Sequence, residues 1–335
     1  MTRWASDPER AADELIGRCL GAIDLGGRVL LANQSGTLPS TLAARGIDPA
    51  VWNRRLADNL PARPWPMPGP FDLALLRLPK ARDEQEMAAH ACLSVLDRAG
   101  ALVVYGGNDE GIRPAAGMLE RLCGRVETLA ARGHGRVLMA TRPDDLSTVR
   151  GALAEWRTVL PLAMGGSTRA WASYPGVFAA GRVDEGTALL IDALPAFKSG
   201  ARLLDYGCGA GVVAAAVARH GGMALDLIDS DSVALEAARE NVPGARLVLG
   251  LSLRDAGGRY DAILSNPPLH RGAVEDHGPL QRLIIDAPTH LATGGILMIV
   301  VQRRLPLDRL LARHLADVAI AAENTRYRVW HARNP

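Results

Sequence analysis

The stretch Leu203–Gly211, with the sequence LLDYGCGAG, decides the fold of this chain of 335 residues. It begins as an apolar strand candidate, turns through three glycines at alternate positions, and opens a segment rich in alanine and valine. Glycines let a backbone turn sharply and approach a ligand closely, because any Cβ would fill that space. A strand, a glycine-rich turn and a helix in this order predict α/β layers around a mainly parallel sheet.

The spacing of the glycines indicates which kind of ligand this turn binds. A nicotinamide dinucleotide fingerprint reads G-x-G-x-x-G, whereas Gly207, Gly209 and Gly211 form G-x-G-x-G. An acid, Asp205, lies two residues before the first glycine. This pattern suits a ligand with an amino-acid moiety, a free ammonium and no pyrophosphate. We expect Asp205 to help hold the methionine part of such a ligand, directly or through water.

A second acid ends the next strand candidate. Asp229 follows the glycine turn by about twenty residues, and an acid at that strand end can accept hydrogen bonds from both ribose hydroxyls. The alternative is that Asp229 caps the helix expected at 232–241. Because Asp231 or Ser230 could serve as that cap, we predict that Asp229 binds the ribose. The cofactor-binding residues expected at this edge are Asp205, Gly207, Cys208, Gly209, Gly211, Asp229 and Ser230.

Strand and helix candidates alternate along the whole chain. In the second half, the expected strands are residues 202–206, 224–229, 245–249, 260–265 and 295–302, and the expected helices are 212–220, 232–241 and 280–291. In the first half, the expected strands are 28–33, 71–78, 101–105 and 136–140, and the expected helices are 8–20 and 83–98. Residues 63–70 include four prolines, which predict a loop because proline fixes φ and lacks a donor.

The two halves share an alignable segment. The sequence YDAILSNPP at 260–268 aligns without gaps on FDLALLRLP at 71–79, and a helix candidate, a glycine turn and an apolar strand follow each. We interpret this as a duplication whose first copy has lost its chemistry, because Arg77 stands where the second copy has Asn266. We expect two α/β domains, residues 1–160 and 161–335, with a boundary between about 143 and 175 where turn residues gather.

The segment after the strand at 260–265 carries the candidate catalytic residues Asn266, Pro267 and Pro268. Ligands bind at the carboxyl edge of such a sheet. The Asn266 side-chain oxygen and the Pro267 carbonyl can each accept one hydrogen of a planar exocyclic amine, which localises the nitrogen lone pair for attack. The prolines stiffen the loop, so that these acceptors are preorganised. A structural Asn-Pro turn is the alternative, but the register with the glycine turn and Asp229 favours catalysis.

The glycine loop, the strand-end acid and the Asn-Pro-Pro segment together resemble class I S-adenosylmethionine-dependent methyltransferases that modify amino groups. More narrowly, the chain resembles the bacterial small-subunit ribosomal RNA guanine-N2 methyltransferase C family. The segments that carry this likeness are Tyr174–Phe178, Val183–Thr187, Asn266–Gly272, Leu78–Lys80 and Gly107–Arg113. The resemblance implies tandem Rossmann-like domains, the N-terminal one degenerate, and S-adenosylmethionine as the cofactor. It implies methyl transfer to guanine N2 of ribosomal RNA, with release of S-adenosylhomocysteine.

The resemblance also adds residues to the expected site. Phe178 and the turn from Asp184 to Thr187 would help close the cofactor pocket, with core packing as the alternative for Phe178. His270 matches the family motif as a substrate contact, although a lone histidine beside a turn is often structural. The adenine-contacting region around 249–253 contains Gly250 and no acid.

Leu269 departs from the family pattern, which usually has an aromatic residue there to stack on the target base. Leucine keeps an apolar face for the substrate but loses stacking, which is worth on the order of 1–3 kcal/mol per base. Another aromatic residue could compensate, or the substrate could differ. The candidates for compensation are Trp171, Tyr327 and Trp330.

Composition and charge bound the remaining properties. Hydrophobic residues make up 48% and charged residues 22%, as in an ordinary globular protein, and the apolar runs are too short for a membrane span. The four cysteines lie far apart, which argues against a zinc site or a disulfide framework and fits a reducing cytoplasm. We expect no signal peptide, no metal and no membrane partner.

Residues 301–335 hold seven arginines and three acids, although the net charge of the chain is only +2. Arginine matches phosphate geometry, so this segment could contact RNA. The alternative is a solvated surface in a chain that has only two lysines, Lys80 and Lys198. The expected partner is ribosomal RNA or the small ribosomal subunit, bound by a monomer.

Three rival functions stay open at this stage. The acceptor could be an adenine amine, a protein glutamine amide or a small molecule. The chain could instead be a non-catalytic RNA-binding or ribosome assembly factor, although Asp205, Asp229 and Asn266 argue against that. A dinucleotide oxidoreductase is disfavoured by the glycine spacing.

Overall fold

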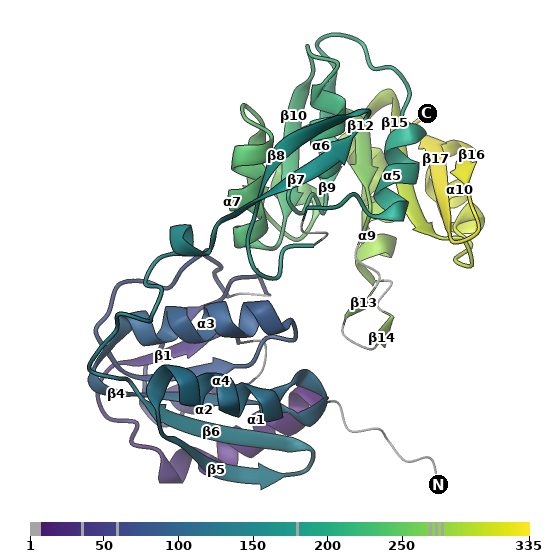
Figure 1. Ribbon diagram of the computed structural model, residues 1–335. Helices are drawn as coiled ribbons and strands as arrows, with labels where there is room; N and C mark the ends of the chain where they lie inside the picture. The colour runs from purple at the N-terminus through teal and green to yellow at the C-terminus, as the bar shows by residue number, and fades with distance from the viewer. Residues whose placement is uncertain are drawn as a thin grey trace, which may run out of the picture. The chain divides into compact units, whose positions relative to one another are not determined.

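The computed structural model describes residues 8–34, 37–57, 60–178, 181–267, 270–271, 274–275 and 278–335 (Figure 1). The chain divides into two compact units, Met1–Trp156 and Arg157–Pro335. Each unit is built around one mixed β-sheet with helices beside it, so the expected α/β class is confirmed. Within the described ranges, no helix is long and apolar enough to cross a membrane.

The sheet of the second unit has seven strands in the order β11-β10-β9-β12-β15-β17-β16. Their bounds are β9 (Arg202–Tyr206), β10 (Ala224–Asp229), β11 (Arg246–Leu249), β12 (Tyr260–Ser265), β15 (Leu291–Gln302), β16 (Ala316–Glu323) and β17 (Tyr327–Arg333). The strands from β11 to β15 pair in parallel, and β17 and β16 continue the sheet in antiparallel pairs. Because parallel strands share their carboxyl edge, the ends of β9, β10, β11 and β12 meet there.

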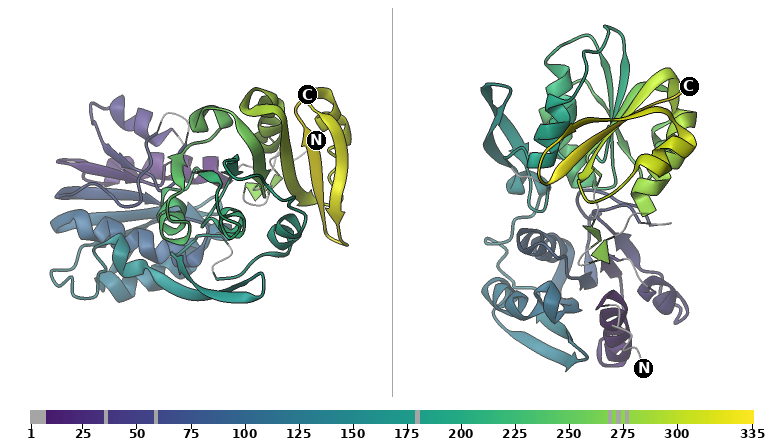
Figure 2. Two further views of the ribbon diagram at one scale, coloured as in Figure 1. Left: turned by 90° about the horizontal axis from the view of Figure 1, so that it is seen from above. Right: turned by 90° about the vertical axis from the view of Figure 1, so that its right-hand side faces the viewer.

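Helices cover both faces of this sheet (Figure 2). One face is covered by α5 (Glu185–Asp192) and α6 (Val212–Ala218). The other face is covered by α8 (Leu253–Ala256), α9 (Gly278–His290) and α10 (Asp308–His314). The remaining helix, α7 (Ser232–Asn241), packs beside β10 and β11. Leu203 and Leu264 enter the core under α5 and α6, whereas Leu204 and Ile263 enter the core under α8 and α9. The continuous apolar runs therefore reflect burial on both faces.

Two short antiparallel pairs complete the second unit. They are the hairpin of β7 (Thr158–Met164) and β8 (Ser167–Ser173), and the pair of β13 (His270–Arg271) and β14 (Val274–Glu275). The hairpin packs against α7, where the Asn241 side chain hydrogen-bonds the backbone of Ala172 in both directions. The hairpin is therefore fixed to the sheet through α7.

The first unit repeats the plan of the second. Its sheet order is β2-β1-β3-β4-β6-β5, with β1 (Val29–Ala32), β2 (Ala50–Trp52), β3 (Phe71–Arg77), β4 (Leu96–Gly107), β5 (Val126–Arg132) and β6 (Gly135–Thr141). Its helices are α1 (Pro8–Cys19), α2 (Leu38–Ala43), α3 (Arg82–Val95) and α4 (Ile112–Cys123), with 3₁₀ turns η1 (Leu20–Ala22), η2 (Asn108–Glu110) and η3 (Leu153–Trp156). The parallel and antiparallel pairings match those of the seven-stranded sheet, in which, among its described strands, β11 alone has no counterpart.

An irregularity at the same place in both sheets supports the duplication. The register shifts near the start of β3 where it pairs with β4, and near the start of β12 where it pairs with β15. In each case a residue with positive φ, Ala99 at 57° or Gly294 at 74°, precedes a glycine. A Cβ on Gly295 would lie 2.9 Å from the carbonyl oxygen of Tyr260, the first residue of β12. In the same way, a Cβ on Gly100 would lie 3.1 Å from the carbonyl oxygen of Phe71, the first residue of β3. Both sheets therefore have a glycine at the point where the two strands approach most closely.

Several sequence-based boundaries are corrected by the structure. The helix expected at 83–98 ends at Val95, because Leu96 already pairs with β3, and the helix expected at 280–291 ends at His290, because Leu291 pairs with β12. Of the turn-rich stretch 160–166 at the expected domain boundary, residues 160–164 lie in β7, and Gly165 and Gly166 form the turn to β8. The elements that were not predicted are the strands β2, β5, β8, β13, β14, β16 and β17 and the helices α2, α4, α5, α8 and α10. Residues 63–70 form the expected loop.

We predict that Ala99→Gly stabilises the protein by about 1 kcal/mol, because a left-handed conformation costs an L-residue with a Cβ about that much. Ala99 is exposed, so no packing is lost. The measurement is the free energy of unfolding of the first unit's transition in denaturant. The matched control is Ala131→Gly, also an exposed alanine but within β5, which should lower stability instead. Equal effects of the two substitutions would contradict the prediction.

Candidate functional site

The glycine turn is fastened to the end of β10. The backbone N–H groups of Gly207 and Cys208 donate to the Ile228 carbonyl at 2.9 and 3.1 Å. The Gly209 N–H donates to Asp229 Oδ2 at 2.8 Å. These bonds hold the turn against the strand-end acid that the sequence singled out.

Two of the glycines play different parts in the turn. Gly211 has a φ of 87°, and a Cβ there would lie 2.8 Å from Val242 Cγ2, so this glycine lets the chain pass close to α7. Gly209 has a φ of 53°, and a Cβ there would meet no described atom within 4 Å. Open space therefore borders the turn at Gly209, next to the Asp229 carboxylate, which fits a bound ligand.

Asp205 lies within the site as a buried carboxyl group. It is 4% exposed, and its Oδ2 accepts the backbone N–H of Ala214 in α6 at 3.0 Å. Burial raises the pKa of Asp205 to about 7; the Ala214 hydrogen bond acts in the opposite direction, and the Asp229 charge adds to the rise. A cation beside this group would favour its ionised form, and the methionine ammonium of S-adenosylmethionine is such a cation.

Asp229 and Asp231, at the end of β10, accept hydrogen bonds from different segments. Asp231 is the N-cap of α7, and its side chain accepts the N–H groups of Val233 and Ala234. Asp229 accepts the Gly209 N–H through Oδ2 and the Asp231 N–H through Oδ1 at 2.8 Å. Asp229 therefore lies beside the glycine turn as a carboxylate acceptor, which is the chemistry that a ribose hydroxyl requires. Ser230 lies between the two acids and is half-buried.

The loop after β11 is held by an acid that sequence reasoning missed. Asp255 Oδ2 accepts the N–H groups of Leu251 and Ser252, both at 2.9 Å. Burial raises the pKa of Asp255, but these hydrogen bonds and the Ser252 hydroxyl outweigh burial and lower it. The Tyr206 hydroxyl donates to the Leu251 carbonyl at 2.8 Å. The signal was the capping pattern Ser-x-x-Asp, just beyond the region searched for an adenine-contacting acid.

Strand register brings Asn266 to the glycine turn. Ser265 pairs with Tyr206 across the parallel β12–β9 ladder, and the Ser265 hydroxyl donates to the Tyr206 carbonyl at 2.8 Å. Asn266 and Gly207 each come directly after the end of these two strands, which run about 4.8 Å apart. The candidate catalytic residue and the candidate cofactor turn therefore meet at one edge of the sheet, and buried Pro267 continues that edge.

The Asn266 side chain has defined partners. Its Nδ2 donates to Asp184 Oδ2 at 3.2 Å and to Thr187 Oγ1 at 2.8 Å. Thr187 is 6% exposed, and its hydroxyl also donates to Asp184 Oδ2. Asp184 is the N-cap of α5 and accepts the Gly186 N–H. The turn that was expected to close the cofactor pocket thus binds Asn266 directly.

The remaining expected site residues are placed differently. Phe178 is 66% exposed, so core packing of its side chain is excluded. Cys208 is buried, and burial, Asp229 and Asp205 together raise the pKa of its thiol. Pro268 and Leu269 lie outside the described residues. The backbone of His270 pairs with Glu275 in the β13–β14 ladder, and its side chain is outside the described part.

Two of the three aromatic residues considered as stacking partners are excluded. Trp171 is 1% exposed and Trp330 is 6% exposed, so neither ring can present a face to a base. Tyr327 is half-buried, with its ring against Gly186 at the start of α5. The idea that Trp171 or Trp330 replaces a stacking aromatic is therefore wrong, because both side chains are used in packing.

The corresponding edge of the first unit is filled by side chains. Arg77, aligned with Asn266, donates to Glu110 at 2.8 Å inside the unit, and both groups are buried. Gln34, which follows β1, donates to the Ala32 carbonyl and accepts the Tyr105 hydroxyl at 2.8 Å. These polar side chains occupy the edge where the second unit has its glycine turn, and Arg77 Nη1 is buried there without a hydrogen-bond partner among the described residues. The described part of this edge thus provides no cradle like that at Gly209.

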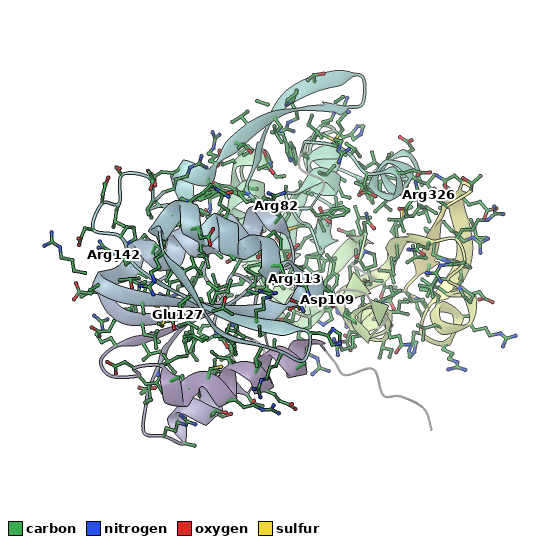
Figure 3. All side chains as sticks on the ribbon, turned by 60° about the horizontal axis from the view of Figure 1, so that its bottom comes forward. Arg82, Asp109, Arg113, Glu127, Arg142 and Arg326 are labelled. Carbon is green, nitrogen blue, oxygen red and sulfur yellow. The ribbon has the colours of Figure 1, made fainter. Side chains whose placement is uncertain are left out.

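Most of the C-terminal arginines are engaged in ion pairs. Arg303 and Arg328 pair with Glu323 at 3.6 and 2.8 Å. Arg333 pairs with Asp317 at 3.3 Å, and Arg326, at the turn between β16 and β17, pairs with Glu185 of α5 at 2.9 Å (Figure 3). Phosphate would have to compete with these carboxylates for four of the seven arginines.

Comparison with known proteins identifies the family. The methyltransferase small domain matches residues 169–331, and the methyltransferase small domain N-terminal model matches residues 30–144. The ribosomal RNA small subunit methyltransferase C of Pseudomonas fluorescens is 35% identical over 78% of this chain and 79% of that protein. The protein of the same name from Hahella chejuensis is 29% identical over 92% of this chain and 94% of that protein.

The chain belongs to the ribosomal RNA small subunit methyltransferase C family. As a member of this family, it is a class I S-adenosylmethionine-dependent methyltransferase. A solved structure, the T. Thermophilus 16S rRNA N2 G1207 methyltransferase in complex with AdoMet and guanosine, has the same two-domain fold. It superposes with a TM-score of 0.84 at 21% identity, covering 99% of this chain and 93% of that one. The fold predicted from the glycine turn and the internal repeat is confirmed.

We predict that S-adenosylmethionine binds more weakly as the pH falls from about 7.5 to about 6. The pKa of Asp205 is raised to about 7, and the ammonium favours the ionised carboxylate. Protonation of Asp205 should therefore increase the dissociation constant by on the order of tenfold over this range. Calorimetry in buffers of different ionisation enthalpy would also detect proton release on binding. An affinity that does not change with pH would contradict this role of Asp205.

Asp205→Asn is the matched variant for this experiment. It should bind the cofactor more weakly at pH 7.5 and lose the pH dependence. The sign for stability is opposite. Because the folded pKa lies above the ordinary value of 3.8, the stability contributed by protonated Asp205 is lost as the pH rises from about 3.8 to about 7. Without the cofactor, Asp205→Asn should therefore gain stability relative to the native chain above pH 7, as measured by thermal unfolding.

Proposed function

We propose that this chain transfers a methyl group from S-adenosylmethionine to the exocyclic N2 amine of a guanine in small-subunit ribosomal RNA. Family membership supports the reaction and the substrate class. The structural observation that carries the proposal is the β9–β12 register, which brings Asn266 beside the glycine turn. Both halves of a transfer site, one for the donor and one for the acceptor amine, then share one sheet edge.

The residues at this edge fit the cofactor. Asp205 would hold the methionine ammonium, Asp229 the ribose hydroxyls, and the turn at Gly207 and Gly209 would lie against the ligand. Ser230, Cys208 and Gly211 complete this turn and strand end. The exposed side chain of Phe178 would cover the bound cofactor. When bound, S-adenosylmethionine would supply an electrophilic methyl group. The N–C bond would form as the S–C bond breaks, leaving S-adenosylhomocysteine, and one N2 proton would pass to solvent.

Asn266 and Pro267 act on the acceptor amine. Guanine N2 has two hydrogens and a lone pair that is delocalised into the ring. The Asn266 Oδ1 and the Pro267 carbonyl each accept one hydrogen, which orients the nitrogen and localises its lone pair. Acceptors held in place before the substrate arrives lower the barrier, since they need no reorganisation. Pro268, Leu269 and His270 follow directly in the chain and would border the base.

RNA binding and cellular location complete the proposal. The first unit and the arginine-bearing segment 303–333 would contact the RNA backbone, with the paired arginines exchanging carboxylate for phosphate. Ribosomal RNA as substrate implies action in the cytoplasm, and the four cysteines are free thiols there. We propose that a monomer performs the reaction, because both halves of the site come from one unit of one chain.

The proposal is tested by supplying tritiated-methyl S-adenosylmethionine with purified small ribosomal subunits, with naked small-subunit RNA and with protein substrates. Digestion to nucleosides should place the label in N2-methylguanosine. A label in methylated adenine or in protein would replace the proposed acceptor with another one. Cofactor binding without transfer to any substrate would support an assembly factor and refute the enzyme.

We predict that Asn266→Ala reduces turnover by at least about 100-fold, because one of the preorganised acceptors is lost. The affinity for S-adenosylmethionine should change little, since none of the hydrogen bonds that hold the glycine turn involves Asn266 in the described part of the chain. Steady-state rates and calorimetry measure the two effects. Parallel losses of turnover and cofactor affinity would show that Asn266 serves the cofactor instead.

A further inference from the structure

The start of α5 approaches the catalytic edge although it lies about eighty residues earlier in the chain. Asp184, its N-cap, and Thr187, one turn along, both contact the amide of Asn266. Thr187 is buried at 6% exposure, so its hydroxyl is not a solvated surface group. Capping alone does not explain these contacts, because the Asp184 Oδ1 already accepts the Gly186 N–H at 3.0 Å and the contacts to Asn266 use Oδ2.

The chemistry of these partners determines which way the Asn266 amide points. A carboxylate oxygen accepts hydrogen bonds and cannot donate. The Thr187 hydroxyl donates its one hydrogen to Asp184, so towards Asn266 its oxygen can act only as an acceptor. Both neighbours therefore require the Nδ2 group. A flipped amide would place Oδ1 against two acceptors, which is repulsive, and would leave Nδ2 towards the substrate.

We propose that Asp184 and Thr187 are positioning residues that fix the amide orientation of Asn266, so that Oδ1 accepts a hydrogen of the target amine. The inference rests on the proposed function and deepens it, since it assigns the turn at 184–187 to the acceptor side of the site. It replaces direct cofactor contact as the main role of Thr187. The orientation is set before substrate binds, because every donor and acceptor in the cluster comes from the chain itself.

The turn is also held from its outer side. Glu185 accepts the Asn324 Nδ2 at 3.1 Å and an Arg326 N–H at 2.9 Å, both from the turn between β16 and β17. The ring of Tyr327 lies so close to Gly186 that a Cβ there would be 3.2 Å from it. The first turn of α5 is thus fastened to the sheet on one side and to Asn266 on the other. A group held at both ends can serve as a rigid support.

The test uses substitutions that keep the side-chain volume of Thr187 or the N-cap of α5 at Asp184. Thr187→Val preserves shape but removes the hydroxyl, and Thr187→Ser restores it. Asp184→Asn can keep an oxygen on the Gly186 N–H but presents an NH₂ group to Asn266, which favours the flipped amide. The control substitution is Thr289→Val. Thr289 is an exposed residue of α9 whose hydroxyl also donates a hydrogen bond, to the Asp286 carbonyl. It lies near the start of β15, at the edge of the sheet opposite the site.

Thr187→Val and Asp184→Asn should lower kcat by on the order of 10- to 100-fold, as expected when an acceptor is misplaced. The dissociation constant of S-adenosylmethionine and the KM for the RNA substrate should stay within about twofold of those of the native chain. Thr187→Ser should recover most of kcat, and Thr289→Val should match the native enzyme in all three quantities. Melting temperatures measured alongside separate a loss of fold from a loss of orientation.

A second readout does not depend on activity. The side-chain amide protons of Asn266, assigned by their absence in Asn266→Ala, should exchange slowly with solvent in the native chain. They should shift and exchange faster in Thr187→Val and Asp184→Asn. A native chain without transferase activity would refute the proposed function, and this readout would still decide whether the amide is held.

Three results would overturn the inference. One is unchanged kcat in both Thr187→Val and Asp184→Asn. Another is a cofactor dissociation constant that rises in step with the loss of kcat, which would make Thr187 a cofactor contact. The third is an Asn266 side-chain amide that exchanges as fast in the native chain as in the two variants.

Discussion

The parallel pairing of β9 with β12 is the interaction on which the rest of the site depends. It aligns Ser265 with Tyr206, and the Ser265 hydroxyl reinforces the ladder at its last position. Both strands then leave the sheet side by side, β9 into the glycine turn and β12 into Asn266 and Pro267. A shift by one residue would turn every side chain of β12 to the other face, so the buried pattern of that strand also protects the geometry of the site.

The site is built by hydrogen bonds between loops rather than by the strands alone. Asp229 holds the glycine turn, Asp255 holds the loop after β11, and Asp184 holds the amide of Asn266. In each case a carboxylate accepts N–H donors from a neighbouring segment, which orders a loop that has little regular structure of its own. Asp205 differs, because burial opposes its charge, and among the described residues one backbone N–H, that of Ala214, compensates it. A cationic ligand would relieve that imbalance.

The two units show how one scaffold can keep or lose such a site. They share strand order, pairing directions and the irregularity near the start of β3 and β12. The first unit places a buried Arg77–Glu110 pair at the edge where the second has Asn266. A buried charge must be paired, and in this pair the charges of Arg77 and Glu110 compensate each other. The two units can share one fold although these side chains differ, because the hydrophobic cores lie under the helices and not at the strand ends.

Sequence alone determined the architecture and the chemical character of the edge. Local signals were sufficient there: the glycine turn and the strand-end acid lie within one strand–turn–helix unit, and the repeat around Asn266 and Arg77 is a gapless match. The antiparallel strands β16 and β17 were missed because most of their residues are partly or fully exposed and their arginines suggested a solvated segment. Trp171 and Trp330 are candidates for stacking in the sequence because burial cannot be inferred from a single aromatic residue.

Only the tertiary structure decided which groups face Asn266, since Asp184 and Thr187 lie far away in the sequence and meet it through the packing of α5 against the sheet. The physical reason is that hydrogen-bond direction depends on which donors and acceptors are brought within about 3 Å of each other, and that is settled by packing.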